Sequence, residues 1–276
     1  MKELKRILSH IIPKNKTCLL PSGFQAIGDI IILNLKPGLQ EYEKQIGQAI
    51  IRSMPRIKTV AVKYSTVKGE LRLPQIKPIA GNGTVTTHRE NRCKYKLDVA
   101  KVMFAKGNVK ERARLPRLVK PGETIVDMFA GIGYFSLPIA IHSNPRKIIA
   151  IEKNPDSVHY LNENIILNRI HNVEVIEGDN RDTDIENVAD RVIMGYLPKT
   201  EKFLPTAVNF LKEKGTIHFH NTYKNSELWE RPINELEKAA IDAGYKMDKI
   251  SRKVVVKHFA PGVEHIVIDA EFKQVS

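Results

Sequence analysis

The sequence has few cysteines and no long apolar run, and each absence excludes a class of protein. Cys18 and Cys93 are its only cysteines, and no Cys-x-x-Cys pair occurs. A disulfide framework or a cysteine zinc site is therefore not expected, and a reducing cytoplasm suits this usage. No apolar stretch approaches the roughly 20 residues that span a membrane. We therefore expect no membrane span. We also expect no signal peptide, because residues 1–6 are largely charged.

The positive charge of the chain is concentrated in its first part. The 276 residues carry a formal net charge of +13. Residues 1–120 contain 25 Lys and Arg against 8 Asp and Glu, whereas residues 121–276 contain 19 against 23. This asymmetry predicts a polyanion-binding first module, with nucleic acid as the favoured partner, and a different second module. A solvated basic face without a partner is the alternative, and charge alone does not separate DNA from RNA.

The hydrophobic pattern changes near residue 121. Before this point, short strand and helix patterns, including a strand over 25–35, predict a small basic α/β domain over residues 1–105 and a linker over 106–120. After it, strand patterns alternate with helix patterns, one of them a helix over 200–213, and the chain closes with two strand patterns. This alternation predicts a Rossmann-like, doubly wound α/β sheet over residues 121–276, with an antiparallel C-terminal edge strand.

A glycine turn after the first strand of that sheet is the most informative motif. Asp127 stands at the carboxyl end of the strand, Gly131 and Gly133 form a turn that opens a helix, and Glu152 ends the next apolar strand. Glycines let a ligand approach the backbone, and an acid at the tip of the second strand can hold two ribose hydroxyls. The motif therefore predicts an adenosine site, with an ordinary strand-to-helix turn as the alternative.

Three adenosine cofactors compete for this turn. A phosphate-binding loop of the Walker type needs Gly-Lys-Ser/Thr, and none follows Gly133. A dinucleotide loop favours a third glycine where Ser136 stands, and Asp127 would repel a pyrophosphate. In S-adenosyl-L-methionine the sulfonium and ammonium groups are positive, so a carboxylate at the first turn is favourable. S-adenosyl-L-methionine is therefore the predicted cofactor, and no metal is expected.

Two further strand ends carry polar or turn residues. The third strand is followed by Gly178-Asp-Asn-Arg-Asp182, and the fourth by Met194-Gly-Tyr-Leu-Pro198. Asp179 can accept from an adenine amino group, and Asn180 can offer a donor and an acceptor together. Such a turn is often only a turn. Its place at the ligand-binding edge of the sheet favours adenine recognition.

The wider motif set resembles a known family of tRNA-modifying enzymes. It comprises Phe104-Ala-Lys-Gly-Asn-Val-Lys-Glu-Arg112, Asp127-Met-Phe-Ala-Gly-Ile-Gly133, Gly178-Asp-Asn-Arg-Asp182, Met194-Gly-Tyr-Leu-Pro198 and His218-Phe-His-Asn221. Over about residues 25–272 the chain resembles class I S-adenosylmethionine-dependent enzymes, and more narrowly those that act at guanosine-37 of tRNA. These are the tRNA guanine-N1 methyltransferases and the related aminocarboxypropyltransferases of wybutosine synthesis.

Two positions separate these two groups of enzymes. The methyltransferases usually have an arginine that serves proton transfer where this chain has Gly107. They also have an Asn-Leu-Pro motif, whereas here Gly195 and Tyr196 precede Leu-Pro and the asparagine is absent. The chain is therefore more similar to the tRNA wybutosine-synthesising protein 2 family. One departure is Ala105, which stands where that family usually has serine, so that only backbone contact remains.

The resemblance implies a set of binding residues. It places the ribose on Glu152, the adenine near Asp179 and Asn180, and the cofactor carboxylate on Arg112, for which a tRNA-facing surface position is the alternative. The cofactor set is Ala105, Arg112, Asp127, Gly131, Gly133, Glu152, Asp179 and Asn180. Candidate substrate contacts, with no catalytic residue assigned, are Lys106, Arg114, Tyr196 and His220.

The resemblance also implies a reaction. It is the transfer of the 3-amino-3-carboxypropyl group of S-adenosyl-L-methionine to C7 of 4-demethylwyosine at position 37 of tRNA-Phe, with release of 5′-methylthioadenosine. All three carbons on sulfur are activated by one positive charge, so the geometry of the pocket would select the carbon that reacts. The alternatives are methyl transfer to N1 of guanosine-37 and a tRNA-binding module without turnover. A cytoplasmic monomer with tRNA-Phe as its partner is expected.

Overall fold

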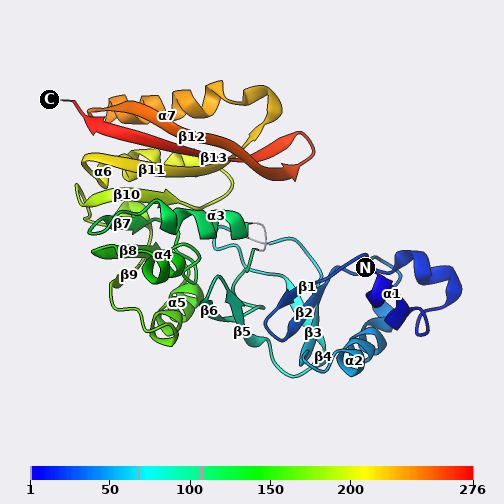
Figure 1. The fold of residues 1–276 in the computed structure, drawn as a ribbon. Helices are drawn as coiled ribbons and strands as arrows, with labels where there is room; N and C mark the ends of the chain where they lie inside the picture. Colours follow the sequence, from blue (N-terminus) through cyan, green and yellow to red (C-terminus); the bar gives the residue numbers. More distant parts are fainter. Residues whose placement is uncertain (1, 68, 106–107, 276) are drawn as a thin grey trace. The chain divides into compact units, whose positions relative to one another are not determined.

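The computed structural model describes residues 2–67, 69–105 and 108–275. The chain divides into two units, residues 1–106 and 107–276, and each has a sheet of its own (Figure 1). Among the described residues, no helix is long and apolar enough to cross a membrane. Cys18 lies at the surface and Cys93 in the interior, and they are not joined by a disulfide.

The described residues of the first unit form a four-stranded sheet, two α-helices and a separate hairpin. The strand order is β1-β2-β3-β4, with β2 and β3 parallel and the other neighbours antiparallel. Apolar side chains of both helices pack on this sheet, among them Leu8, Ile46 and Ile50, because they recur at helical spacing. The bounds are α1 (Lys2–Leu8), β1 (Gln25–Ile27), β2 (Ile30–Leu33), α2 (Glu43–Ser53), β3 (Thr59–Lys63), β4 (Ile76–Gly81), β5 (Val85–Glu90) and β6 (Cys93–Asp98).

The single strand predicted over residues 25–35 is wrong, because the chain reverses at Gly28 to form β1 and β2. Gly28 has φ +54°, and a Cβ there would overlap the Thr86 hydroxyl, so only glycine fits. Asp29 follows in the turn, and its carboxylate accepts from the Thr86 hydroxyl at 2.6 Å. The hairpin of β5 and β6 is thereby joined to the turn of the first sheet.

The second unit contains one seven-stranded sheet in the order β12-β13-β11-β10-β7-β8-β9. Strands β7 to β11 run parallel, and β13 is antiparallel to both of its neighbours. This is the doubly wound α/β sheet that the sequence predicts, although the antiparallel strand lies inside the sheet and β12 forms its edge. The bounds are β7 (Thr124–Asp127), β8 (Lys147–Glu152), β9 (Val173–Glu177), β10 (Ala189–Met194), β11 (Leu211–Lys224), β12 (Tyr245–Ala260) and β13 (Val263–Gln274).

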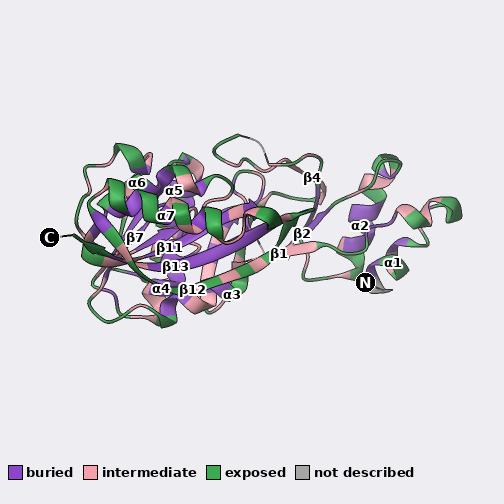
Figure 2. Ribbon diagram, turned by 90° about the horizontal axis from the view of Figure 1, so that it is seen from above, coloured by how far each residue is buried: buried purple, intermediate pink, exposed green. Residues whose placement is uncertain are grey.

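Helices cover both faces of this sheet, because successive strand residues point to opposite sides. Ile125 and Ile193 pack in one cluster with Ile139 of α4, whereas Val126 packs in the other with Leu236 of α7. Figure 2 shows the buried strands between helices whose outer surfaces are exposed. The helices are α3 (Val109–Arg114), α4 (Ser136–His142), α5 (Pro155–Leu167), α6 (Leu204–Asn209) and α7 (Glu230–Asp242).

Two segments differ from the sequence prediction. Residues 109–114 of the expected linker form α3, which belongs to the second unit. The helix predicted over 200–213 ends at Asn209, and β11 begins at Leu211. The amide of Ala189 donates to the carbonyl of Phe210 at 2.8 Å, and Leu211 pairs with Ala189. Strand pairing therefore overrides the local helix preference of this segment.

Candidate cofactor and substrate site

The strand order reverses between β7 and β10, because β8 follows on the outer side of β7 and β11 on the outer side of β10. In open α/β sheets, ligands bind at the carboxyl ends of the strands at such a point. Asp127 ends β7 and Glu152 ends β8, Asn180 follows β9, and Tyr196 follows β10. The topology therefore brings four of the residues predicted from the sequence to one edge of the sheet.

The glycine turn is held to the next strand by Glu152. Gly131 and Gly133 have φ of +56° and +97°, and a Cβ on Gly133 would lie 2.5 Å from the Leu137 side chain. The Gly131 amide donates to Glu152 Oε2 at 2.7 Å, and the Asn154 amide donates to Oε1 at 2.8 Å. Burial raises the pKa of the Glu152 carboxyl. Each of its oxygens has a second lone pair, so Glu152 can fix the turn and still accept from a ligand hydroxyl.

Asp127 is a buried carboxylate with one oxygen left over. It is 0% exposed, its Oδ2 accepts from the Ser136 hydroxyl at 2.7 Å, and its Oδ1 has no hydrogen-bond partner. Burial, and to a smaller extent the nearby Glu152 charge, raises the pKa of Asp127 to about 6. Ser136, which takes the place of a third glycine, thus has a role that the sequence did not indicate. A buried carboxylate with an unpaired oxygen suits a positively charged ligand.

The turn after β9 contains one open acceptor and one engaged carboxylate. Asn180 is buried, its Nδ2 donates to the Met128 carbonyl at 3.1 Å, and its Oδ1 has no partner. Asp179 instead accepts from Arg181 at 2.7 and 2.9 Å and from Lys153 at 3.1 Å. The Arg181 guanidinium holds the pKa of Asp179 well below its usual range. The geometry therefore favours Asn180 over Asp179 as the adenine contact.

An aromatic wall follows β10. The Tyr196 ring stacks on Phe129 with centroids 5.1 Å apart, and Phe203 meets Phe129 edge-on at 4.9 Å. At Gly195, a Cβ would lie 2.7 Å from the Phe135 ring, so the loop can approach this ring only as glycine. Tyr196, the residue before Leu-Pro in this chain, is thus held as a stacked ring.

Asn221 of β11 holds the loop that contains Tyr196. Its Oδ1 accepts from the Lys199 amide at 3.1 Å and from the Thr200 amide at 3.4 Å. The Thr200 hydroxyl donates to the Tyr196 carbonyl, and Asn221 Nδ2 donates to Glu201 at 2.8 Å. Asn221 belongs to the His-Phe-His-Asn motif, but its spacing in the sequence does not reveal this contact.

His220 is an interior residue rather than a solvent-facing one. It is 1% exposed, its ring lies 5.5 Å from the Phe135 ring, and its Nδ1 lies 3.3 Å from His265 Nε2. Its Nε2 has no hydrogen-bond partner. Burial, followed by the charge of His265, lowers the pKa of His220 well below its usual value. A substrate contact through His220 stays a prediction.

The two arginines of α3, Arg112 and Arg114, are buried or ion-paired within the second unit. Arg114 forms a fork with the buried Asp269 of β13 at 2.5 and 3.2 Å, and it also donates to Glu111 at 2.9 Å. The Arg114 guanidinium therefore supplies the cation that the buried Asp269 requires, and a substrate contact through Arg114 stays a prediction. Arg112 is 2% exposed, which disagrees with its surface alternative. Its cofactor role stays a prediction.

Three further positions that the sequence singled out are not part of this geometry. Lys106 and Gly107 lie outside the described residues, and Ala105 belongs to the first unit. Their roles stay predictions.

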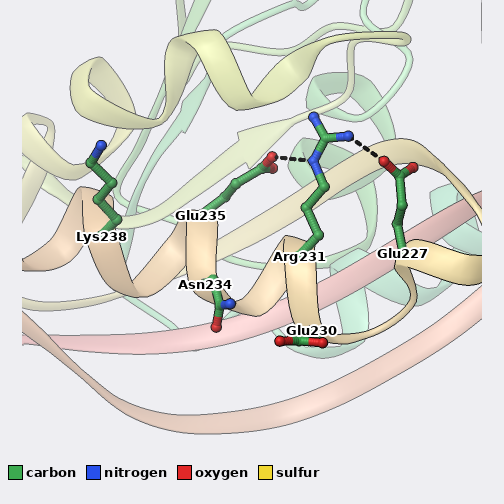
Figure 3. Close-up of a pocket in the computed structure, with 6 residues that line it drawn as sticks. All are labelled: Glu227, Glu230, Arg231, Asn234, Glu235 and Lys238. Atoms are coloured by element: carbon green, nitrogen blue, oxygen red, sulfur yellow. Dashed lines mark hydrogen bonds and ion pairs between the residues drawn. The ribbon is translucent and has the colours of Figure 1, made fainter.

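A surface depression of about 330 Å³ lies over α7, away from the predicted residues (Figure 3). Arg231 bridges Glu227 and Glu235 there at 2.5 and 2.9 Å, so these charges are satisfied within the protein. The lining residues are Glu227, Glu230, Arg231, Asn234, Glu235 and Lys238. In the described part of the chain, no group of three or more His, Cys, Asp or Glu side chains could hold a metal ion.

Two family descriptions match the chain. Residues 86–248 match the TRM5/TYW2 methyltransferase domain, and residues 4–84 match the TYW2 N-terminal domain.

Among known proteins, the chain is 46% identical over 253 residues to the tRNA(Phe) (4-demethylwyosine(37)-C(7)) aminocarboxypropyltransferase of Methanocaldococcus jannaschii, covering 91% of this chain and 98% of the relative. It is 35% identical over 259 residues to the tRNA (guanine(37)-N(1))-methyltransferase Trm5b of Pyrococcus abyssi, covering 94% and 77%. The crystal structure of Pyrococcus horikoshii TYW2 in complex with MeSAdo has a TM-score of 0.88 and 38% identity over 99% of each chain. The Rossmann-like fold and the family indicated by the motifs are confirmed, and this chain belongs to the TRM5/TYW2 family.

Proposed function

We propose that this protein transfers the 3-amino-3-carboxypropyl group of S-adenosyl-L-methionine to C7 of 4-demethylwyosine at position 37 of tRNA-Phe. The relative of the same named activity is 46% identical, against 35% for the methyltransferase Trm5b. The structural observation that carries the proposal is the stack of Tyr196 on Phe129. By resemblance, Tyr196 stands where the methyltransferases have the asparagine of their Asn-Leu-Pro motif, so that side-chain amide is missing here.

The residues at the carboxyl edge fit an adenosine cofactor of positive charge. Asp127 and Asn180 each offer a buried oxygen without a partner, and the glycine turn leaves no room for side chains. We infer that Glu152 holds the ribose hydroxyls, Asn180 the adenine, and Asp127 the positive charge. Arg112 would pair with the cofactor carboxylate, by resemblance to the family.

When bound, S-adenosyl-L-methionine supplies three electrophilic carbons on one sulfonium, and position selects the one that reacts. The residues of this chain supply that position. The rings of Phe129 and Tyr196 form an apolar wall beside the glycine turn, and Asn221 fixes the loop that carries Tyr196. In the P. horikoshii TYW2 structure the bound molecule is MeSAdo, the methylthioadenosine that such a transfer releases.

The tRNA partner belongs to the same proposal. Residues 1–106 contain 20 Lys and Arg against 7 Asp and Glu, which suits a polyanion, and residues 4–84 match the TYW2 N-terminal domain. We assign this first unit to tRNA binding. A monomeric state and a cytoplasmic location complete the proposal.

The deciding experiment uses S-adenosyl-L-methionine labelled in the carboxypropyl arm and tRNA-Phe that bears 4-demethylwyosine. Label should enter the tRNA, with a mass gain of about 100 Da rather than the about 14 Da of a methyl group, because geometry selects the carbon. A gain of one methyl group would support the methyltransferase alternative. Retained tRNA affinity with no transfer, unchanged by Glu152→Ala, would leave a binding module without turnover.

A further inference from the structure

The edge strand β12 carries positive charge within an otherwise acidic region. Residues 121–276 contain more acidic than basic side chains, yet residues 245–260 contain five Lys and Arg against one Asp. Arg252 turns inward, with its guanidinium 3.2 Å from Glu111 of α3. The four lysines of the strand are exposed instead, and they are Lys246, Lys249, Lys253 and Lys257.

The charge of these lysines is not neutralised by the protein. Within the described ranges, none of the four forms an ion pair, although Lys253 Nζ lies 5.8 Å over the Trp229 ring. Elsewhere in the same unit, Lys212 pairs with Asp190 at 2.7 Å, and Lys153 with Asp179 at 3.1 Å. The β12 lysines therefore offer their charge to an anion from outside the protein.

The two ends of β12 lie at opposite edges of the sheet. Lys246 pairs with Lys273, which pairs with Lys214 near the amino end of β11. Lys257 pairs with His265, which pairs with Thr222 beyond the last residue of β10. Eleven residues of extended chain separate Lys246 from Lys257 by roughly 35 Å. The hairpin of β12 and β13 therefore turns at the carboxyl edge, where the candidate site lies (Figure 1).

This hairpin also exposes apolar side chains at the same end. Val255 is 44% exposed and Phe259 is 46% exposed, and Phe259 follows Lys257 and His258 directly. Figure 2 shows β12 as an exposed and half-exposed ribbon beside the buried β13. An exposed phenyl ring beside lysines is the combination that binds single-stranded RNA, because every base has a face that stacks on an aromatic ring.

We propose that the hairpin from Lys253 to Phe259 is a second RNA-contacting surface, which binds the backbone of the tRNA loop that carries nucleotide 37. This inference rests on the proposed function, because it requires a tRNA at the carboxyl edge. Lys253 and Lys257 bind phosphates, and Phe259 stacks on an unpaired base. The first unit then supplies one basic surface and the edge of the large sheet supplies another.

Edge protection is the competing explanation for lysines on β12. Charged side chains on an edge strand prevent pairing with a second sheet. Glutamate would serve that purpose as well as lysine, and Lys246 would serve it as well as Lys257. Charge reversal therefore separates the two explanations, since it keeps a charged edge and removes the attraction to phosphate.

The test compares two double variants that change the net charge equally. Lys253→Glu with Lys257→Glu alters the end near the site, and Lys246→Glu with Lys249→Glu alters the far end. The affinity for tRNA-Phe bearing 4-demethylwyosine is measured over a series of salt concentrations. The near variant should bind tRNA at least tenfold more weakly. The negative slope of log K against log salt should become less steep by about 1.5, the value for two phosphate contacts. The far variant should stay within threefold of wild type.

Further measurements keep the result interpretable. Affinity for S-adenosyl-L-methionine and the thermal midpoint should be unchanged in both variants. Phe259→Ala should weaken tRNA binding about fivefold or more without changing the salt slope, because stacking involves no counterion. If wild type transfers the labelled group, but the two double variants lose tRNA affinity equally or not at all, the hairpin is not an RNA-contacting surface. The proposed function would then still stand. Wild type that neither binds tRNA nor transfers label would overturn the proposed function, and this surface with it.

Discussion

The turns after β7 and β9 hold their polar atoms differently from the loop after β10. In the turns, Asp127 and Asn180 each keep one buried oxygen without a hydrogen-bond partner. Asn221 accepts from two backbone amides of the loop and donates to Glu201, so the chain from Tyr196 to Thr200 is fastened internally. A buried polar atom without a partner destabilises a fold, and is retained where a ligand completes the site. This difference agrees with the proposed function, in which the turns offer these oxygens to the cofactor and the loop keeps its shape without a ligand.

The largest loss of cofactor affinity is expected from Glu152→Ala, which removes a hydrogen-bond acceptor beside the glycine turn. The Gly131 and Asn154 amides lose their partner, and the proposed ribose hydroxyls lose theirs. Hydrogen bonds to a charged group stabilise by about 1.5–3 kcal/mol each, so affinity for S-adenosyl-L-methionine should fall at least about 100-fold. Isothermal titration calorimetry measures this. Glu174→Ala is the matched control, because Glu174 is an exposed residue of β9, and an equal loss there would contradict the prediction.

Asp127→Asn should separate stability from binding. Because the folded pKa of about 6 lies above the ordinary 3.8, the native state favours the neutral acid. The resulting stability is present below pH 3.8 and is lost as pH rises through 6, up to about 3 kcal/mol. The asparagine variant should therefore be more stable than wild type at pH 8, as measured by urea unfolding without ligand. The difference should shrink towards pH 5, and a variant that is less stable at pH 8 would contradict this account.

Binding should show the opposite dependence on pH. A positively charged ligand favours the ionised carboxylate, so wild-type affinity for S-adenosyl-L-methionine should improve as pH rises through 6 and be about tenfold weaker at pH 5 than at pH 7.5. In Asp127→Asn the affinity should be lower and nearly flat over this range. Equilibrium dialysis at several pH values measures both. If wild-type affinity depends on pH as little as that of the variant, Asp127 does not bind the positive charge of the cofactor.

The sequence predicts the turns after β7 and β9 better than the loop after β10. The reason is the separation along the sequence between residues that contact each other. Asp127, the two glycines and Glu152 lie within 26 residues, and strand ends and glycine turns are local patterns. The alternation of strands and helices likewise predicts the large sheet. Arg114 and Asp269, by contrast, are 155 residues apart, so their ion pair leaves no local pattern. The helix predicted over 200–213 failed for the same reason, since β11 begins where it pairs with β10.

Asn221→Ala should disturb the loop without disturbing cofactor affinity. The Lys199 and Thr200 amides lose their acceptor, and neutral hydrogen bonds contribute about 1 kcal/mol each. If Tyr196 positions the base, kcat for transfer should fall roughly tenfold, while Kd for S-adenosyl-L-methionine stays unchanged. Asn225→Ala, at an exposed position just beyond the same strand, is the control. A lower thermal midpoint with unchanged kcat would mean that Asn221 has only a structural role.

The smallest effect is expected from Arg231→Ala, on the outer surface of α7. Its ion pairs with Glu227 and Glu235 are exposed, and water and salt screen such pairs. The thermal midpoint should fall by less than about 3 °C, and transfer and cofactor binding should be unchanged. Glu235 also accepts from the Tyr223 hydroxyl, which accepts from Asn221 at 3.0 Å. A loss of kcat in Arg231→Ala as large as in Asn221→Ala would therefore show that the loop depends on α7 through this chain of contacts. The residues that fix the loop would then include a surface residue of α7 as well as Asn221.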